Sequence, residues 1–153
     1  MGGSVDLLEG VSREVAADKF KGKLWATARY IHNYPDTSEN KKFVEAFRKR
    51  WGRFPNYSAE GSYSAIYAIK AGAEKAKTLE TGKVAAALEG MELKTPGGVR
   101  LIRKEDHQAI YAVPAGRVMM SPGYPLPILG DLKVIPARDY FRHPPFTPVA
   151  ATK

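Results

Sequence analysis

Residues 56–98 read NYSAEGSYSAIYAIKAGAEKAKTLETGKVAAALEGMELKTPGG. Apolar residues recur at helical period after Ser58, which is expected to cap a long helix that continues to Ala76. Small residues fill the positions between them, so one flank of this helix is flat enough to lie close to a sheet. The apolar stripe is large and requires a cover of comparable size. It consists of Tyr63, Ile66, Tyr67 and Ile69.

A second, shorter helix follows within the same stretch. It is predicted to begin at Thr81, and Gly90 can end it in the left-handed conformation that glycine favours. Residues 95–98, Thr-Pro-Gly-Gly, then predict a turn before a strand. The glycines of this turn indicate backbone geometry rather than a cradle for a ligand.

Three elements are predicted before this stretch. A short helix is expected over about residues 5–17. Residues 20–31 alternate in polarity and predict a strand. Asp36 and Glu39 have the spacing of a capping box, and a helix with aromatic residues at every fourth position is expected from there to Gly52.

The pattern after Gly98 predicts a small antiparallel β meander. Its strands are expected at residues 99–102, 108–113 and 117–120, with turns at 104–106 and 115–116. One more short strand is predicted at residues 132–135 within a proline-rich segment that begins near Ser121. We expect the tail beyond Arg142 to be disordered or to lie on a partner's surface.

The composition indicates a single globular domain. With 153 residues, 44% hydrophobic and 26% charged, the chain can bury one core. We expect no membrane insertion, because no uninterrupted apolar run approaches the roughly 18 residues of a transmembrane helix. The first ten residues lack the basic start and apolar run of a signal peptide, so no export signal is expected in this chain. There is no cysteine, which excludes disulfides and thiol catalysis.

The net charge is +8 at pH 7, which raises the question of nucleic-acid binding. The basic residues are scattered, however, and the densest group alternates with aromatic residues at core spacing. We therefore interpret this group as the solvated face of an amphipathic helix rather than as a track for phosphates. Its members are Lys41, Lys42, Arg48, Lys49, Arg50 and Arg53.

Catalytic and metal-binding patterns are absent from the sequence. Asp106 and His107 are adjacent, and neighbouring side chains on a strand or turn point in different directions, so they do not form a dyad. No serine lies in a nucleophile-elbow context, and no two histidines have metal-ligand spacing. The Gly82-Lys83 pair fails as a phosphate-binding loop because the preceding glycine is missing. We expect no enzyme activity, no cofactor and no metal.

The order of the segments resembles the C-terminal part of a solute-binding protein of ABC transporters, in the type I periplasmic branch that includes the leucine/isoleucine/valine-binding proteins. The resemblance covers about residues 2–139. It depends on the order and spacing of short motifs: a Phe-rich helix ending near a Gly and a Pro, Tyr-x-Ala-Ile on a long helix, a Leu-x-Gly helix end, Thr-Pro-x-Gly and Asp-His-Gln. In this chain they are Phe43, Phe47, Gly52, Pro55, Tyr63, Ala65, Ile66, Leu88, Gly90, Thr95, Pro96, Gly98, Asp106, His107 and Gln108.

The resemblance implies a partial type I periplasmic-binding-protein fold, in which two three-layer α/β lobes flank a cleft and strands cross between them. It assigns residues 1–30 to a remnant of the second lobe with a crossing strand. Residues 31–120 would form the junction of the first and second lobes, and residues 121–153 a proline-rich C-terminal segment. Most of the first lobe would be missing, so the apolar stripe of the long helix would need a missing N-terminal half or a second copy to cover it.

The function implied by the resemblance is the reversible capture of a small solute, such as an amino acid or related carboxylate, between closing lobes. Gly3 and Ser4 would offer main-chain N–H groups or a hydroxyl. Asp6 would hold the ligand ammonium, although it also fits a first-turn carboxylate beside a helix N-terminus. Tyr30 and Tyr34 would lie at the hinge or cleft. An ABC permease would be the partner, and the location would be periplasmic if the chain belongs to an exported protein.

Two other functions stay open from the sequence. The same fold can serve as a sensor or protein-interaction module that uses the apolar helix as its interface. The positive charge leaves a basic nucleic-acid-binding domain as a further alternative.

Overall fold

The computed structural model describes residues 24–145 of the chain. The first helix in this range, α2, spans Ser38–Trp51. Its N-cap is Thr37, whose hydroxyl accepts the Asn40 backbone N–H at 3.2 Å, and it ends at Gly52 with a φ of 67°. The predicted helix is thus confirmed, with its cap one residue later than the Asp36 that the capping-box spacing suggested.

The long helix, α3, spans Tyr57–Ala76. Its cap is Asn56, whose side-chain oxygen accepts the backbone N–H of Ala59 at 3.0 Å. The prediction of Ser58 as the cap was wrong, because Asn56 is also a strong capping residue and starts the helix two residues earlier.

The shorter helix, α4, spans Thr81–Leu88, and Gly90 follows it with a φ of 69°, as predicted. This helix packs on the small-residue flank of α3. A Cβ atom at Gly72 would lie 3.0 Å from the Leu88 Cγ and 3.1 Å from the Val84 Cγ1. The flat flank of α3 therefore accommodates a neighbouring helix.

The strands form two antiparallel sheets. The first has the order β1-β5-β6, and its strands are Trp25–Thr27, Val113–Met119 and Ile128–Ile135. The second has the order β2-β3-β4, and its strands are Glu92–Thr95, Gly98–Ile102 and Ala109–Ile110. A single turn of 3-10 helix, η1, follows at Ala137–Asp139.

The expected meander is only partly correct. Residues 92–110 do form one, although β2 was not predicted, whereas the segment predicted as one strand at 108–113 divides between the two sheets. Residues 115–116 do not form a turn but lie within β5 at a bulge. A Cβ atom at Gly116 would lie 2.6 Å from the main-chain oxygen of Gly130, so this glycine permits close approach of strands. The last strand, β6, begins four residues earlier than expected.

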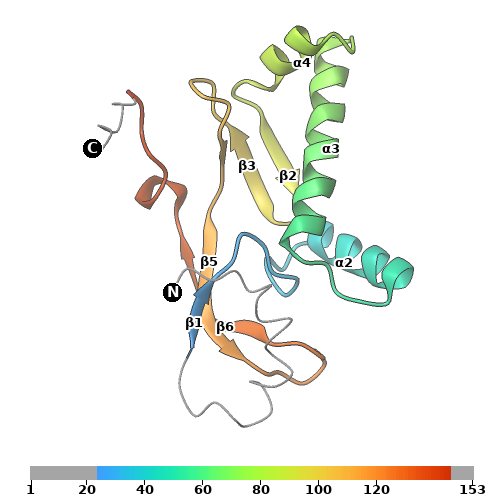
Figure 1. The fold of residues 1–153 in the computed structure, drawn as a ribbon, viewed down its shortest axis with the longest axis vertical. Coiled ribbons are helices and arrows are strands. Elements are labelled where there is room, and N and C mark those ends of the chain that lie inside the picture. Colours follow the sequence, from blue (N-terminus) through green and yellow to red (C-terminus); the bar gives the residue numbers. More distant parts are fainter. Residues whose placement is uncertain (1–23, 146–153) are drawn as a thin grey trace, which may run out of the picture.

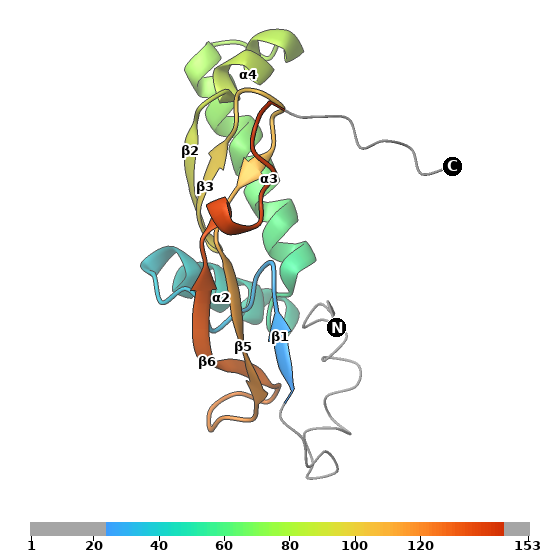
Figure 2. The same ribbon diagram turned by 90° about the vertical axis from the view of Figure 1, so that its left-hand side faces the viewer.

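The described part of the chain is elongated (Figure 1). The β1-β5-β6 sheet lies at one end, while α3 runs beside β2 and β3 toward α4 at the other end (Figures 1 and 2). Helix α2 crosses near the first turns of α3 (Figure 1). A small core lies against the first sheet, where Ala28, Ile31 and Leu129 are buried.

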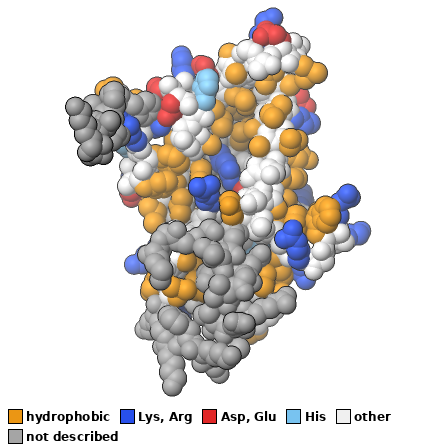
Figure 3. Space-filling model, in the orientation of Figure 1, with side chains coloured by type: hydrophobic (Ala, Val, Ile, Leu, Met, Phe, Trp, Pro, Cys, Tyr) orange, Lys and Arg blue, Asp and Glu red, His pale blue; other side chains and the backbone are white. Residues whose placement is uncertain are grey.

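One side of α3 is uncovered by the described residues. We call it the α3 face, and it consists of Tyr63, Ile66, Tyr67 and Ile69, which are all exposed. Hydrophobic side chains are visible at the surface in the upper part of the molecule, where α3 and α4 lie (Figure 3). The expectation that this chain supplies only part of the cover is consistent with that exposure. Within residues 24–145, no helix combines the length and hydropathy required to cross a membrane.

We predict that the α3 face contributes little to the stability of the isolated chain. Ile66→Lys should change the free energy of unfolding by less than about 0.5 kcal/mol, because the side chain is 65% exposed. Leu129→Ala should cost about 2–5 kcal/mol, because Leu129 is 1% exposed and its truncation leaves a cavity. Urea unfolding at several protein concentrations measures both. A similar loss in the two variants would show that the face is covered in solution.

Candidate functional site

Residues 28–36 lead from β1, in the β1-β5-β6 sheet, to helix α2, and we call them the first crossing segment. Two hydrogen bonds attach this segment to the sheet, and a third closes a turn within it. The Ala28 N–H donates to the Pro114 carbonyl at 3.1 Å, the Asn33 side chain donates to the Leu129 carbonyl at 3.1 Å, and the Tyr34 N–H donates to the Ile31 carbonyl at 3.0 Å. The sheet therefore fixes the path by which the chain enters α2.

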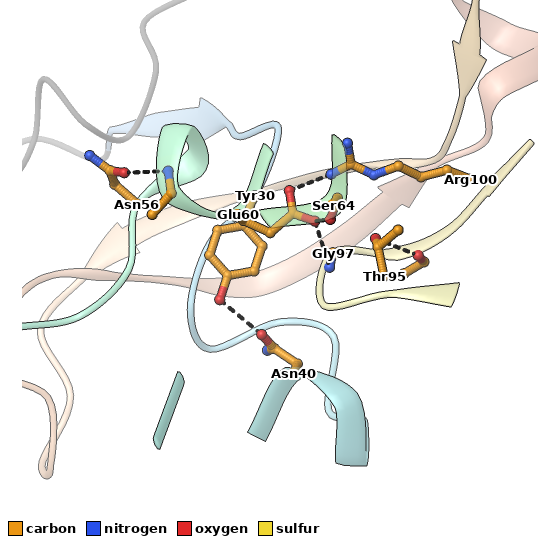
Figure 4. A network of polar contacts seen from close by, with 10 residues as sticks. Tyr30, Asn40, Asn56, Glu60, Ser64, Thr95, Gly97 and Arg100 are labelled. Carbon is orange, nitrogen blue, oxygen red and sulfur yellow. Dashed lines mark hydrogen bonds and ion pairs between the residues drawn. The ribbon is translucent and has the colours of Figure 1, made fainter. Parts of the chain in front are cut away.

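Tyr30 anchors this segment to α2. Its hydroxyl donates to Asn40 Oδ1 at 2.8 Å, and both residues are buried (Figure 4). The Asn40 Nδ2 in turn donates to the carbonyls of His32 and Pro35 at 3.2 and 3.0 Å. Burial raises the pKa of Tyr30, and the charge of Glu60 raises it further, so the phenol stays protonated as a donor.

Tyr34 packs against the core cluster of the first sheet. Both tyrosines proposed for the hinge or cleft thus lie on the first crossing segment. Their role in ligand binding or hinge motion stays a prediction.

A second crossing, at Tyr111 and Ala112, joins β4 of one sheet to β5 of the other. The Arg100 guanidinium lies 5.0 Å from the centre of the Tyr111 ring, in a cation–π arrangement. The Tyr140 hydroxyl also donates a hydrogen bond to the Tyr111 carbonyl. Side chains from both β3 and the η1 segment therefore hold this crossing.

Glu60 is the centre of a polar network that joins α3 to the β2-β3 hairpin (Figure 4). It lies in the first turn of α3 and is 1% exposed. Its carboxylate accepts the Ser64 hydroxyl at 2.6 Å and the Gly97 N–H at 3.2 Å, and it forms an ion pair with Arg100. A Cβ atom at Gly97 would lie 3.1 Å from the Glu60 Oε1, so a side chain there would crowd the carboxylate. The network holds the start of α3 on the β2-β3 hairpin.

Sequence reasoning missed Glu60 and Arg100. They are forty positions apart in the sequence. Charged residues are mostly exposed to solvent, so each of them alone would be interpreted as a surface residue. The one local sign is that Glu60 stands in a run of small and aromatic residues.

A groove of about 920 Å³ lies at the junction of the first crossing segment, α2 and the loop between β5 and β6. We call it the junction groove. It is lined by His32, Asn33, Pro35, Asp36, Asn40, Lys41, Val44, Glu45, Arg48, Lys49, Gly52, Phe54, Gly123 and Tyr124.

Three rings meet in the junction groove. The His32 ring lies 4.3 Å from the Phe54 ring and 5.3 Å from the Tyr124 ring, measured between centroids. Burial lowers the pKa of His32 to about 4, and the positive charge of Arg48 contributes. The imidazole is therefore neutral at pH 7 and belongs to an uncharged aromatic surface.

A second groove, of about 550 Å³, lies between α2 and α3 and continues into the α3 face. Phe43 joins its aromatic residues: the ring lies 4.8 Å from Tyr63 and 6.0 Å from Phe47. Since its lining includes Tyr63 and Tyr67 of the α3 face, we regard this groove as part of the same uncovered surface.

Of the other sequence candidates, Gly3, Ser4 and Asp6 lie outside the described residues. Asp106 and His107 line neither groove. Asp106 pairs with Arg103 at 2.6 Å, and the His107 Nε2 lies 3.1 Å from Glu89, so the adjacent acid and histidine form no dyad. Among residues 24–145, no group of three or more His, Asp or Glu side chains is placed to hold a metal ion.

Comparison with known proteins identifies the family. A sequence profile described as "Periplasmic binding protein" matches residues 7–121, so the chain belongs to the periplasmic binding protein family. The predicted class is thus confirmed: the chain has part of a type I periplasmic-binding-protein fold. No curated protein sequence matches it.

Solved structures support the same assignment. An ABC-type branched-chain amino acid transporter from Rhodopseudomonas palustris CGA009 is 28% identical with a TM-score of 0.74, and the match covers 90% of this chain and 35% of that one. A leucine-binding protein from Thermotoga maritima shares the fold at 19% identity and a TM-score of 0.63, covering 90% of this chain and 44% of that one. A solute-binding protein from R. palustris in complex with 4-hydroxybenzoate also shares the fold, at 18% identity and a TM-score of 0.72. That match covers 87% of this chain and 36% of that one. The chain spans about a third of the length of the R. palustris proteins.

We predict that removing the Glu60 charge destabilises the chain strongly. Glu60→Gln keeps the size of the side chain but leaves Arg100, which is 16% exposed, without its carboxylate. The expected cost is about 3 kcal/mol. Asp131→Asn is the matched control, because the Arg117–Asp131 pair is well exposed and should be worth less than about 1 kcal/mol. Equal losses in urea unfolding would contradict the central position of Glu60.

We also predict a stability change with pH that depends on His32. The pKa of this residue is about 4 in the folded chain and about 6.5 when unfolded, so the unfolded state binds the proton more readily. Stability should be constant above pH 6.5 and should fall by about 1–2 kcal/mol as the pH drops toward 4, after allowance for partial solvent screening.

Thermal unfolding of the wild type and of His32→Phe between pH 7 and 5 isolates this contribution. The variant should lose less stability over this range, whereas His143→Gln, at an exposed position, should behave like the wild type. Parallel curves for wild type and His32→Phe would contradict the prediction.

Proposed function

We propose that this chain is part of the solute-binding component of an ABC transporter. The assembled protein would reversibly bind a small carboxylate, such as an amino acid, in a cleft between two lobes. Membership of the periplasmic binding protein family supports this function. The structural observation that carries it is the pair of crossings that leave the β1-β5-β6 sheet: residues 28–36 lead from it to helix α2, and residues 111–112 join it to the β2-β3-β4 sheet. A hinge connects two lobes in the same way.

The same function implies a role for each segment of the chain, a set of solute-binding residues, a partner and a location, and we propose these as well. We assign residues 1–30 to the second lobe, residues 31–120 to the lobe junction and residues 121–153 to the C-terminal segment. Gly3 and Ser4 would bind the solute's carboxylate, and Asp6 would bind an ammonium group. The partner would be an ABC permease, and the complex would act in the periplasm without a catalytic step.

The related structures suggest which solutes to test. One is described as a branched-chain amino acid transporter, and others from R. palustris contain 4-hydroxybenzoate or 3,4-dihydroxybenzoic acid. Amino acids and aromatic acids therefore both belong in a ligand panel. Both classes present a carboxylate to the protein.

A second candidate function is a protein-interaction module, which the exposed α3 face favours. The rim of the adjoining groove carries Lys42, Arg50 and Lys94 against Glu39, so this surface is positively charged. Sedimentation distinguishes the two functions in part: strict monomers at high concentration argue against self-association through this face.

We predict that restoring the missing length restores solute binding. The test is a chimera in which this chain replaces the matched third of the R. palustris CGA009 protein. It should show saturable heat in calorimetry and a raised Tm with at least one amino acid or aromatic acid. Asp6→Asn should abolish binding of an amino acid but leave the fold intact. A folded chimera that responds to no member of the panel would contradict the proposed function.

A further inference from the structure

We propose that the junction groove is a binding site for the planar ring and single carboxylate of an aromatic acid. The proposal rests on the proposed function. For an aromatic acid it assigns the carboxylate to a residue of this groove, whereas Gly3, Ser4 and Asp6 are proposed above for an amino acid.

The groove joins parts of the chain from both sides of the first crossing. Phe54 follows α2, while Tyr124 lies in the loop between β5 and β6, and their ring centroids are 5.9 Å apart. His32, on the crossing segment itself, contacts both rings. An occupant of this groove would therefore touch the crossing and both elements that flank it.

The aromatic lining favours a flat apolar ligand. Phe54 is buried and presents its ring beside His32 and Tyr124, which are both partly buried. The imidazole is neutral at pH 7, so none of the three rings carries a charge there. Flat rings gain from stacked or edge-to-face contacts with such a surface beyond the area that they bury. The volume of about 920 Å³ is within the range of small-molecule sites.

The charges in the groove favour one carboxylate. Lys41 is paired with Asp36 at 2.6 Å, so these two charges offset each other. The other charged residues of the lining are Glu45, Arg48 and Lys49, which leaves one excess positive charge. The Arg48 guanidinium lies 4.4 Å from the centre of the Phe54 ring. Within residues 24–145, no carboxylate lies within 4.0 Å of it.

Arg48 is thus placed to serve both parts of the ligand. Its planar group is oriented by the Phe54 face and keeps its donors available for a carboxylate, which an arginine can bind in a bidentate manner. A ring that stacks near Phe54 would bring its carboxylate to the same guanidinium. Glu45 on the same helix opposes a second negative charge, so a dicarboxylate should bind less well.

Two buried polar atoms in this wall add a preference for a ring hydroxyl. The His32 Nε2 and the Asn33 Oδ1 have no hydrogen-bond partner in the described chain. The Asn oxygen is an acceptor, and the neutral imidazole nitrogen is one when Nδ1 carries the proton. A hydroxyl would supply the missing donor to one of them after a small side-chain shift, because neither atom is open to solvent.

The experiment titrates four acids into the full 153-residue chain: benzoate, 4-hydroxybenzoate, cyclohexanecarboxylate and leucine. Calorimetry and the NMR signals of the Tyr124 ring and the His32 imidazole report binding. We expect both aromatic acids to bind saturably, with 4-hydroxybenzoate tighter than benzoate and cyclohexanecarboxylate at least about tenfold weaker. Leucine should be weaker still.

Two matched variants locate the site. Arg48→Gln should weaken binding of the aromatic acids at least about tenfold, as the loss of a charge-assisted pair predicts. Arg50→Gln is the control, because Arg50 lies in the same last turn of α2 and also faces a ring, that of Trp51 at 5.2 Å, but is not part of the groove. Binding should be unchanged in it. Both side chains are exposed, and circular dichroism should show that both variants fold.

Three results would overturn the proposal: no binding of either aromatic acid, equal binding of cyclohexanecarboxylate, or equal effects of Arg48→Gln and Arg50→Gln. The chimera separates this outcome from failure of the proposed function. A chimera that binds amino acids without any dependence on Arg48 would keep the transport function and remove this site. Arg48-dependent binding of benzoate by the chain, with a chimera that binds no amino acid and binds benzoate no more tightly than the chain does, would keep the site and remove the lobe closure on which the transport function depends.

Discussion

The buried carboxylate of Glu60 is the constraint on which the remaining structure depends. A carboxylate with 1% exposure is tolerated only when donors replace its lost water, and here a hydroxyl, a main-chain N–H and a guanidinium do so. Those donors come from α3, from the β2-β3 turn and from β3. The ion pair therefore sets where the hairpin lies against the first turn of the long helix. Other positions of the hairpin would leave a charge buried without a partner.

The second crossing contacts this network, and the first is held by a separate set of hydrogen bonds. Arg100 uses the rest of its guanidinium surface to pack on Tyr111 at the second crossing. At the first crossing, Asn40 accepts a hydrogen bond from the Tyr30 hydroxyl and donates to the carbonyls of His32 and Pro35. Side chains of α2 and β3 thus help to hold the two crossings, in addition to the β1-β5-β6 sheet.

The helices could be predicted from the sequence because their signals are local. Aromatic spacing defined α2, and the position of Gly90 defined the end of α4. The strands were harder: residues 109–116 are one largely apolar run, and only pairing with distant strands divides it between two sheets. Gly116 was mistaken for a turn because close strand approach leaves no local sign. The Glu60–Arg100 pair and the junction groove depend on contacts between distant segments, which a single sequence does not reveal.

The two grooves differ in what they require of an occupant. The one between α2 and α3 continues into exposed tyrosine and isoleucine side chains, so only another folded surface would cover it. The chain spans about a third of the R. palustris relative, so most of that protein's fold lies outside the matched part. The junction groove, by contrast, is lined by three rings together with several charged and polar side chains, and it has the volume of a small-molecule site. Under the proposed function, a second lobe would close over a solute held there and exclude water. The affinity of this chain alone should then be a lower limit on the affinity of a two-lobed assembly that contains it.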